Sequence, residues 1–504
     1  MRELPSGWCQ TTLDSVVDVL DFEREPINSS ERESRVSGKS ERDLYPYYGA
    51  TGQVGLIDSY RSEGQRVLLG EDAAPFLDPV KDKAYLANGR FWVNNHAHVL
   101  AGAGGLIDNR FLCHQLNVVD YRPFVTGSTR LKLTSAAMRQ LPLFVAPVGE
   151  QTRIVAKLEE LLSDLDAGVA ELKAAQKKLA QYRQSLLKAA VSGDLTAEWR
   201  QRNRPTETGA QLLERILAER RARWEAGQLA KFEAQGKTPP KDWQKKYPEP
   251  VQSDTAELPE LPEGWAWARI EQMGAVQLGR QRAPQFHTGP NMVPYLRVAN
   301  VFEERIDVSD VMEMHFSEED EAAFKLAAGD VLLNEGQSLE WVGRPAIFRG
   351  ELPRACFTNT LVRFRAESGV LAEYALAVFL HYMHSGKFRK IAKITTNIAH
   401  LGAGRFGTLE FPLPSVEEQL EIVRVLRELT DEAQRQGAAI ALALKQSSTQ
   451  LQNILRAAFS GQLVPQDPND EPASALLERI RDQRGAQAGA KKPRGRKAKE
   501  TSHA

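Results

Sequence analysis

The sequence lacks the features that are typical of secreted proteins and of membrane proteins. It has three cysteines, and Cys9, Cys113 and Cys356 form neither a C-x-x-C pair nor a disulfide framework, which favours a reducing compartment. No apolar run approaches the roughly 20 residues of a membrane-spanning helix. The N-terminus also lacks the apolar core of a signal peptide. We therefore expect a cytoplasmic protein with no membrane partner.

An excess of positive charge is also missing. Lys and Arg number 65 against 66 Asp and Glu, a net charge of −1, which argues mildly against a nucleic-acid-binding protein. The average hides basic clusters between residues 200 and 246 and in the last residues, 491–499. A tail of this kind is most simply disordered and solvated, although it could also contact phosphates without sequence preference.

Catalytic and metal-binding motifs are absent from the sequence. Gly38-Lys39-Ser40 resembles the end of a phosphate-binding loop, but Glu33 stands where that loop needs glycine. The glycine-rich run at 101–105 lacks dinucleotide-binding spacing, and we expect a hairpin turn there. His381 and His384 lie in an apolar helical segment and are more typical of boundary histidines than of metal ligands. No Asn/Asp-Pro-Pro-Tyr/Phe, nucleophile elbow or H-E-x-x-H is present, so we expect a binding protein without catalytic residues or a metal site.

A long helix is predicted over residues 150–190. This stretch has no proline and one glycine, Gly168, so it can be one continuous helix. At 1.5 Å per residue it would be roughly 60 Å long, more than a domain needs to cover its own core. Leucines recur every seven residues, as in the seam of a coiled coil, at Leu158, Leu165, Leu172, Leu179 and Leu186.

The chain repeats this helix 268 residues later. Glu150-Gln151-x-x-Ile154-Val155 returns as Glu418-Gln419-x-x-Ile422-Val423, and both stretches close on a Ser-Gly pair suited to a helix C-cap. Because the two copies agree at both ends without an insertion, we predict two helices of one length that pair with each other. Candidate seam positions of the second copy are Leu426, Ile440 and Ile454.

The repeat extends over the globular parts of the chain. Leu4-Pro-Ser-Gly-Trp8 returns as Leu261-Pro-Glu-Gly-Trp265, and about 140 to 150 residues rich in Gly, Pro, aromatic and β-branched residues follow each phrase. Leu212-Leu-Glu-Arg-Ile216 returns as Leu476-Leu-Glu-Arg-Ile480, which predicts a short helix after each long one. We predict a mixed α/β domain at 1–149, a long helix at 150–198, a charged helical connector with a Pro-rich link at 199–257, a second domain at 258–416, a second long helix at 417–463, and a short helix with a basic disordered tail at 464–504.

Candidate contact residues cluster in phrases that occur in both halves. Tyr and Gly in a tight strand-turn unit can simply fill a core, or glycines can let the backbone approach a ligand while hydroxyls and amides meet phosphates or base edges. Arginine suits guanine and asparagine suits adenine. In the first half the candidates are Tyr45, Tyr47, Tyr48, Gly49, Thr51, Gln53, Asn95, Thr129 and Arg130. In the second half they are Tyr295, Arg297, Asn300, Asn359, Thr396, Asn397 and His400.

These phrases together resemble the specificity subunits of type I restriction-modification systems. The resemblance rests on the two L-P-x-G-W openings, on the phrases at 46–52, 67–72 and 294–300, and on the paired starts and ends of the long helices. It covers residues 4–464. It implies an α/β fold of two mixed α/β target recognition domains in a pseudo-two-fold arrangement, separated by an antiparallel coiled coil of two long helices. The connector and the basic tail are longer than the minimal pattern of that family.

The resemblance also implies partners for the chain. Each domain would read one half of a split double-stranded DNA target, and the coiled coil would set the spacing and dock two modification (methyltransferase) subunits. S-adenosylmethionine, ATP and Mg would be bound by those subunits and by an ATP-dependent restriction subunit, with no cofactor in this chain. An adenine would be flipped out of the duplex and methylated by the partners.

Two other classes compete with this interpretation. A methyltransferase or nuclease fused to a recognition module would need an additional catalytic region, and the sequence has neither its motifs nor room for it. A pure coiled-coil scaffold would leave two domains of about 150 residues without a role. Activity of the chain alone, or only together with a modification subunit, would distinguish these classes.

Overall fold

The computed structural model describes residues 4–251, 256, 258–395 and 397–490. The chain divides into two compact units. Residues 1–174 and 440–504 belong to the first, and residues 175–439 belong to the second. Each unit therefore contains one globular domain and parts of both long helices.

The first domain is built on two four-stranded sheets. One sheet has the order β2-β9-β6-β7, all antiparallel, and the other has the order β4-β3-β8-β5, in which β3 and β8 run parallel. A separate two-stranded ladder joins the domain's first and last strands, β1 (Cys9–Thr12) and β10 (Pro142–Val145). The remaining strands are β2 (Val17–Val19), β3 (Tyr45–Gly49), β4 (Gly52–Ile57), β5 (Ser62–Glu63), β6 (Arg66–Gly70), β7 (Ala84–Ala87), β8 (Arg90–Val93) and β9 (Ala97–Gly102). The helices are α1 (Leu13–Val16), α2 (Ser29–Val36), α3 (Asn109–Leu116) and α4 (Ser135–Arg139).

The second domain repeats this topology. Its four-stranded sheet has the order β12-β21-β17-β19, its β13 and β20 pair in parallel, and its first and last strands, β11 and β24, form a ladder. The strands are β11 (Ala266–Arg269), β12 (Gly274–Leu278), β13 (Met292–Leu296), β14 (Val301–Phe302), β15 (Arg305–Ile306), β16 (Met312–His315), β17 (Val331–Asn334), β18 (Gly336–Gln337), β19 (Pro345–Ile347), β20 (Cys356–Phe357), β21 (Leu361–Ala366), β22 (Lys393–Thr395), β23 (Ile398–His400) and β24 (Glu410–Leu413). The helices are α8 (Ile270–Met273), α9 (Glu318–Phe324), α10 (Ala372–His384), α11 (Lys387–Ile391) and α12 (Ala403–Gly407). Buried, mostly apolar runs in β6 and β17 form the centre of each main sheet.

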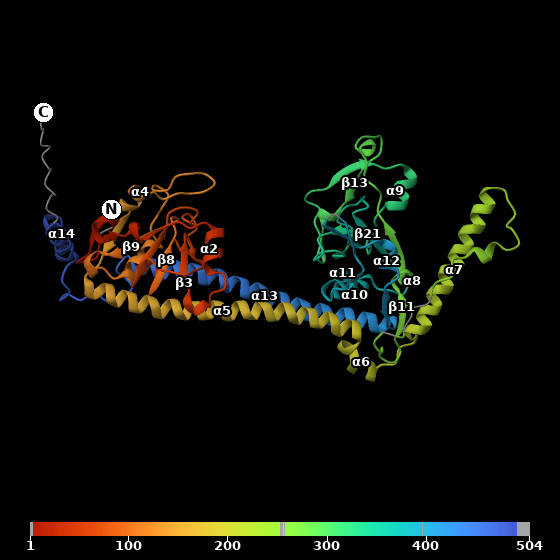
Figure 1. Cartoon of the computed structure of the whole chain (residues 1–504). Coiled ribbons are helices and arrows are strands. Elements are labelled where there is room, and N and C mark those ends of the chain that lie inside the picture. The colour runs from red at the N-terminus through yellow and green to blue at the C-terminus, as the bar shows by residue number, and fades with distance from the viewer. Residues whose placement is uncertain (1–3, 252–255, 257, 396, 491–504) are drawn as a thin grey trace, which may run out of the picture. The chain divides into compact units, whose positions relative to one another are not determined.

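Two long helices join the domains and pack together. Helix α5 is Val148–Ser192 and helix α13 is Val416–Ala458, and the two ribbons lie side by side within each unit (Figure 1). In the first unit, one buried cluster contains Ile154, Val155, Leu158, Ile454, Leu455 and Ala458. In the second unit Leu179 abuts Gly437, and the end of α5 shares a cluster with the start of α13, so the helices run antiparallel. The expected fold of two mixed α/β domains joined by paired long helices is confirmed.

The leucine seam is buried mainly where the helices meet a domain. Leu158 and Leu186 are buried, as is Ile454 on the partner helix. The seam positions between these ends are half-buried, namely Leu165, Leu172, Leu179, Leu426 and Ile440. A two-helix seam leaves part of each side chain in contact with solvent, and a domain covers it completely.

Each domain is fixed to its long helix by the same indole-carboxylate hydrogen bond. Trp8 of the first opening phrase donates from Nε1 to Glu150 at 3.0 Å, and Trp265 of the second donates to Glu418 at 2.9 Å. The glutamine that follows each glutamate bonds backbone groups of the same domain: Gln151 accepts from the Asp108 amide, and its counterpart in α13 accepts from the Leu371 amide. The repeated Trp and Glu-Gln phrases are therefore the joints between domain and helix.

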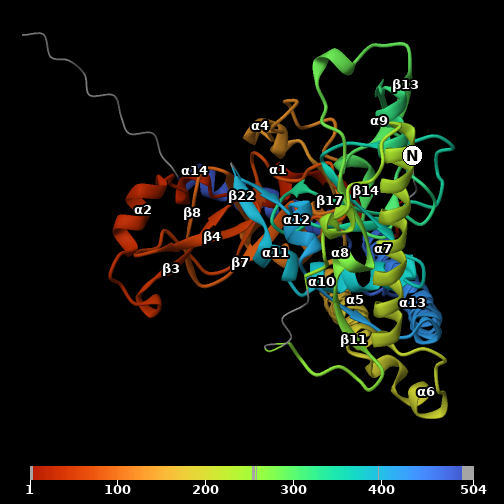
Figure 2. The ribbon, with the colours of Figure 1, turned by 90° about the vertical axis from the view of Figure 1, so that its right-hand side faces the viewer.

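The repeated Leu-Leu-Glu-Arg-Ile segments form helices that cover the domains. Helix α6 (Ala197–Arg202) and helix α7 (Gly209–Ala234) follow α5, and α14 (Ala473–Ala490) follows the second long helix. The Leu212 and Ile216 side chains of α7 enter the core of the second domain, and those of Leu476 and Ile480 enter the core of the first. Figure 2 shows α7 running past α8 and β11 in the second unit. The core of the second domain is therefore covered by α7, which follows α5, and the core of the first domain is covered by α14, which follows α13.

The glycine-rich run at 101–105 differs from its expected hairpin turn. Strand β9 ends at Gly102, and Ala103–Gly105 form a 3-10 turn that leads towards α3. Gly104 has φ +55°, and a Cβ there would meet the side chain of Gln483 on α14. The glycines allow this close approach of α14, which sequence spacing alone does not indicate. The basic run at 491–499 lies outside the described residues.

Candidate nucleic-acid interface

One glutamate at the end of the central strand organises the loops of the first domain. The backbone amide of Glu71, just after β6, donates to the carbonyl of His96 at 2.8 Å. Its carbonyl accepts from the amide of Leu133 at 2.7 Å. Lys132 Nζ lies 3.2 Å from the Glu71 carboxylate. The loops at 94–96 and 126–132 are thereby fastened to one point of the sheet.

The second domain builds the same framework at equivalent positions. The amide of Glu335 donates to the carbonyl of Thr360 at 2.9 Å, and its carbonyl accepts from the amide of Leu401 at 2.8 Å. His400 takes the place of the lysine, with Nδ1 3.0 Å from the Glu335 carboxylate. The hairpin of β22 and β23 thus occupies the place that the 126–132 loop has in the first domain.

A third loop joins this framework on each domain. The Asn94 amide donates to the carbonyl of Tyr48 at 3.0 Å, and the Thr358 amide donates to the carbonyl of Leu296 at 3.1 Å. In the first domain the turn between β3 and β4 also lies against the end of β6, since a Cβ on Gly70 would be 2.9 Å from the carbonyl of residue 50. Three loops distant in sequence therefore meet at the end of β6, and three meet at the end of β17.

Several predicted contact residues of the first domain lie on these three loops. Thr51, Gln53, Asn95, Thr129 and Arg130 are all exposed there. Arg130 Nη2 is 3.1 Å from the Asp72 carboxylate. A group of exposed amide, hydroxyl and guanidinium side chains can meet phosphates and base edges.

The aromatic phrase of the first domain is mainly scaffold. Tyr47 is 2% exposed, and its hydroxyl accepts from the Ile27 amide at 3.2 Å. Tyr48 packs against Phe91, and burial raises the pKa of its hydroxyl. Gly49 is buried in the strand, and the Tyr45 ring packs at a tilt against another tyrosine ring of the domain, with the ring centroids 5.2 Å apart. These side chains position the 50–53 turn instead of presenting themselves on its surface.

In the second domain the 295–300 phrase is also largely engaged within the chain. Tyr295 is 1% exposed and Asn300 is 2% exposed. The Asn300 amide donates to the carbonyls of Asp307 and Asp310, and its oxygen accepts from the Arg297 amide. The Arg297 guanidinium lies 2.6 Å from the Asp310 carboxylate. Asn300 therefore holds a loop, and Arg297 is tied to an acidic neighbour.

The remaining candidates of the second domain surround the β22–β23 hairpin. Asn397 is exposed at its tip with φ +68°, a left-handed conformation that asparagine tolerates. His400 is half-buried beside Glu335, and Asn359 adjoins the framework residue Thr360. Thr396 lies outside the described residues.

The framework glutamates hold the candidate loops in place, and sequence analysis did not single them out. Burial by itself would raise the pKa of Glu71, but Arg24, His98 and Lys132 hold that pKa below its usual range, so the carboxylate stays charged. The sequence does contain a signal for these two glutamates, because the phrase Val-Leu-Leu-x-Glu occurs at both 67–71 and 331–335. The repeat identified the strand, but its periodicity did not show that the last residue ties three loops together.

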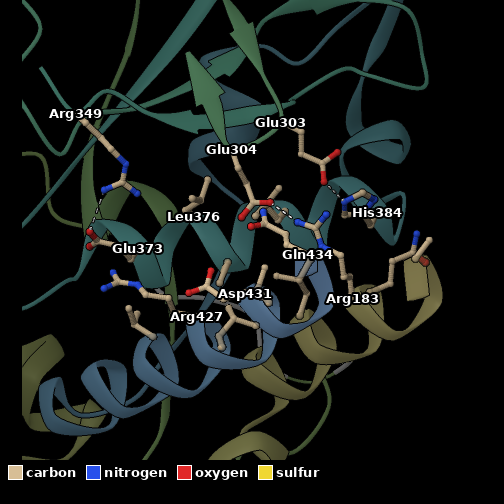
Figure 3. A pocket seen from close by; sticks show the side chains of 18 residues that line it. Arg183, Glu303, Glu304, Arg349, Glu373, Leu376, His384, Arg427, Asp431 and Gln434 are labelled. Carbon is tan, nitrogen blue, oxygen red and sulfur yellow. Dashed lines mark hydrogen bonds and ion pairs between the residues drawn. The ribbon is translucent and has the colours of Figure 1, made fainter. Parts of the chain in front are cut away.

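A cavity of about 400 Å³ in the second unit lies between the domain and both long helices (Figure 3). Arg183 of α5 reaches Glu304 at 2.7 Å, and His384 of α10 lies 2.9 Å from Glu303. Burial raises the pKa of Glu304. Burial would also raise that of Glu303, but its bond to His384 brings the pKa below the usual value. The Arg183–Glu304 pair links the domain to α5, and the His384–Glu303 pair lies within the domain.

The described residues contain no group of three His, Cys, Asp or Glu able to hold a metal ion. Burial raises the pKa of both the Cys113 and Cys356 thiols to about 12, so neither is poised as a thiolate nucleophile. None of the helices in the described ranges is both long and apolar enough to cross a membrane.

Comparisons with known proteins agree with this architecture. Residues 5–175 match the family model for the type I restriction modification DNA specificity domain. A putative type I restriction enzyme specificity subunit of Haemophilus influenzae, S.HindORF215P, is 39% identical over 30% of this chain and 36% of its own length. The EcoKI specificity subunit of Escherichia coli K12 is 25% identical over 77% of this chain and 75% of its own length.

The fold has a counterpart among solved structures. A structure described as showing complex assembly and conformational transition of the type I R-M system aligns with a TM-score of 0.61 at 16% identity. The alignment covers 92% of this chain and all of that one. At this identity the match concerns the fold.

Two domains with one topology, each with three loops fastened to the end of its central strand and a long helix below, define a duplicated recognition protein. The matched family model, a DNA specificity domain, indicates that the recognised molecule is DNA. The chain belongs to the type I restriction-modification specificity subunits and is the DNA specificity subunit of such a system, a non-catalytic component.

Proposed function

We propose that each domain reads one half of a split double-stranded DNA target through the loops fastened to Glu71 or Glu335. The observation that supports this proposal is the same loop framework in two domains of one chain. Phosphate contacts would position the duplex, and exposed side chains on the loops would read base edges. In the first domain the exposed candidates are Thr51, Gln53, Asn95, Thr129 and Arg130. In the second domain Asn397 is exposed, and the half-buried Arg297, Asn359 and His400 lie on the same loop framework.

We propose further that α5 and α13 set the distance between the two half-sites. Matched lengths of 45 and 43 residues support this proposal, since a change in one helix alone would break their register. One heptad inserted into both helices, beside Leu179 and Gly437 where they touch, should lengthen the pair by about 10 Å. That corresponds to about 3 base pairs.

Methylation mapping in cells that carry the lengthened chain measures this spacing directly. The non-specific spacer should grow by about 3 base pairs while both half-sites keep their sequences. An insertion into one helix alone is the matched control and should abolish methylation at the split target. An unchanged spacer in the doubly lengthened chain contradicts the proposed role of the helices.

Independent reading by the domains has its own test. Exchange of residues 1–149 for the equivalent domain of another specificity subunit should change one half of the methylated sequence and leave the other intact. If both halves changed, the domains would not read DNA independently.

We propose that the chain acts in the cytoplasm with two modification subunits and an ATP-dependent restriction subunit. These partners would bind S-adenosylmethionine, ATP and Mg. Labelled methyl transfer to adenine should require the mixture of this chain and a modification subunit. Transfer by this chain alone would favour a fused methyltransferase instead.

A further inference from the structure

The hairpin of β22 and β23 exposes two large apolar side chains. Ile394 is 59% exposed and Ile398 is 46% exposed. Single exposed apolar residues are common, but both of these lie on one short two-stranded ribbon beside the loop framework. The hairpin, of which β22 is labelled in Figure 2, is also paired through β23 to β18.

The two isoleucines point to opposite faces of this ribbon. Ile398 pairs with Thr395, and the pair Lys393–His400 lies two residues along, so these four side chains share one face. Ile394 pairs instead with Ala399, which is 1% exposed and belongs to the core. The face with Ile398 is therefore the outer face of the hairpin. Ile394 lies on the inner face, together with the buried Ala399, although its own side chain is exposed.

The segment that contains the hairpin is rich in positive charge. Residues 374–409 contain no Asp or Glu, although the whole chain carries a net charge of −1. Lys387 pairs with Glu410 at 2.8 Å. Among the described residues Arg389, Lys390 and Lys393 have no ion pair. An unpaired basic segment of this kind complements a polyanion such as a DNA backbone.

The equivalent loop of the first domain is different. Its two cations are paired, Arg130 with Asp72 and Lys132 with Glu71. Its apolar residue, Leu131, is half-buried and packs against the domain core. The combination of an exposed apolar side chain with unpaired cations therefore belongs to the hairpin of the second domain.

We propose that the outer face of the β22–β23 hairpin enters the major groove and that Ile398 contacts the methyl group of a thymine in the half-site read by the second domain. A two-stranded ribbon fits the major groove, and the thymine methyl is the one apolar group that a base pair displays there. Lys393 on the same face would contact a phosphate beside that groove. This inference rests on the proposed function, because it names one base contact within that readout.

The test uses the full chain assembled with its modification subunits and a pool of duplexes randomised at both half-sites. Ile398→Ala should reduce the preference for thymine at one position of the second half about tenfold, the usual cost of one lost base contact, and should leave the first half unchanged. Ile394→Ala is the matched control, since it removes the more exposed isoleucine of the same hairpin from the other face. It should leave every base preference unchanged.

A second measurement changes the DNA and leaves the protein intact. Deoxyuridine in place of that thymine removes only the methyl group, so the wild-type complex should bind the substituted duplex about tenfold more weakly. The Ile398→Ala complex should bind both duplexes equally. Equal losses for both proteins, or equal effects of Ile398→Ala and Ile394→Ala, overturn the thymine contact while the split readout stands. A wild-type complex with no two-part preference overturns the proposed function itself.

Discussion

The joints between domain and helix in the two units share one hydrogen bond and differ in the rest. In both, a buried indole donates to a glutamate at the start of a long helix, Trp8 to Glu150 and Trp265 to Glu418. The second oxygen of Glu418 also accepts from Thr196 at 2.7 Å and from Arg200 at 2.8 and 3.0 Å. The second oxygen of Glu150 is buried and has no hydrogen-bond partner in the described part of the chain.

The difference arises from the segments that follow the helices. At the repeat distance of 268 residues, Val464 and Pro468 stand where Thr196 and Arg200 stand in the other copy, and neither can donate from its side chain. The duplication has therefore kept the indole-carboxylate bond and lost the groups that complete it. We expect the second joint to be the more stable, because Glu418 has three side-chain partners and Glu150 has one.

The largest effect is expected from Arg200→Ala. The change leaves Glu418, 2% exposed, without its positive partner, which should cost about 3 kcal/mol of unfolding free energy in the second unit. Native-state hydrogen exchange, read separately in peptides of the two units, measures this loss.

A matched control for this change lies two residues away. Arg202 pairs with Glu198 on the surface, where both side chains are more than three-quarters exposed, so Arg202→Ala should change stability by less than about 0.5 kcal/mol. Equal effects of the two substitutions would show that Arg200 contributes no more than a surface charge.

The tryptophans provide a comparison between the units. Trp8→Phe removes the hydrogen bond that Glu150 makes through its side chain and leaves the carboxylate buried without a donor, at a cost of about 2 kcal/mol. Trp265→Phe leaves Glu418 bonded to Thr196 and Arg200, so about 1 kcal/mol is expected. Unit-resolved hydrogen exchange should show the larger loss in the first unit, and the reverse order would contradict our account of the two joints.

Sequence repeats predicted the architecture well because each repeated phrase marks a structural requirement. The seven-residue leucine spacing and the two Glu-Gln starts predicted two paired helices, and the structure has them as α5 and α13. The pairing of Trp8 with Glu150 was not predicted, although both belong to repeated phrases. Their separation of 142 residues carries no periodicity, and the contact follows only from the folded domain.

The candidate contact residues show where sequence reasoning stops. Composition alone gave Tyr47 and Asn300 equal standing with Thr51 and Asn397, because all are residue types that can meet DNA. Strands of four or five residues do not reveal which face is buried, and Tyr47 is directed to the core. Asn300 satisfies its amide with carbonyls seven and ten residues later, a local loop geometry that no spacing rule indicates.

Neutralisation of the two glutamates should have opposite effects. Burial raises the pKa of Glu150, so the folded chain binds this proton more tightly than the unfolded chain does. Its ionised form therefore opposes folding, an effect that is absent below the usual glutamate pKa of 4.5 and grows as pH rises through the folded pKa. Glu150→Gln should stabilise the first unit by up to about 1 kcal/mol near pH 8 and lose this advantage near pH 4.

Glu418→Gln is the counterpart in the second unit. It removes the charge that Arg200 faces and should destabilise that unit by about 1 to 2 kcal/mol near pH 8. Urea unfolding of the full chain at several pH values, with hydrogen exchange to assign each unit, checks both signs. Destabilisation by Glu150→Gln at high pH would show that its buried oxygen has a partner.

The smallest effect is expected from rebuilding the missing donor in the first joint. Val464 packs in the cluster that contains Trp8, at the position equivalent to Thr196. Val464→Thr keeps the side-chain shape and adds a hydroxyl that can donate to the free oxygen of Glu150, for a gain of about 0.5 kcal/mol. The same substitution in a Glu150→Ala background removes the acceptor and should instead cost up to about 1 kcal/mol, because the half-buried hydroxyl then loses its intended partner. The difference between the two backgrounds measures the new bond, and equal effects in both would show that the two joints are not geometrically equivalent.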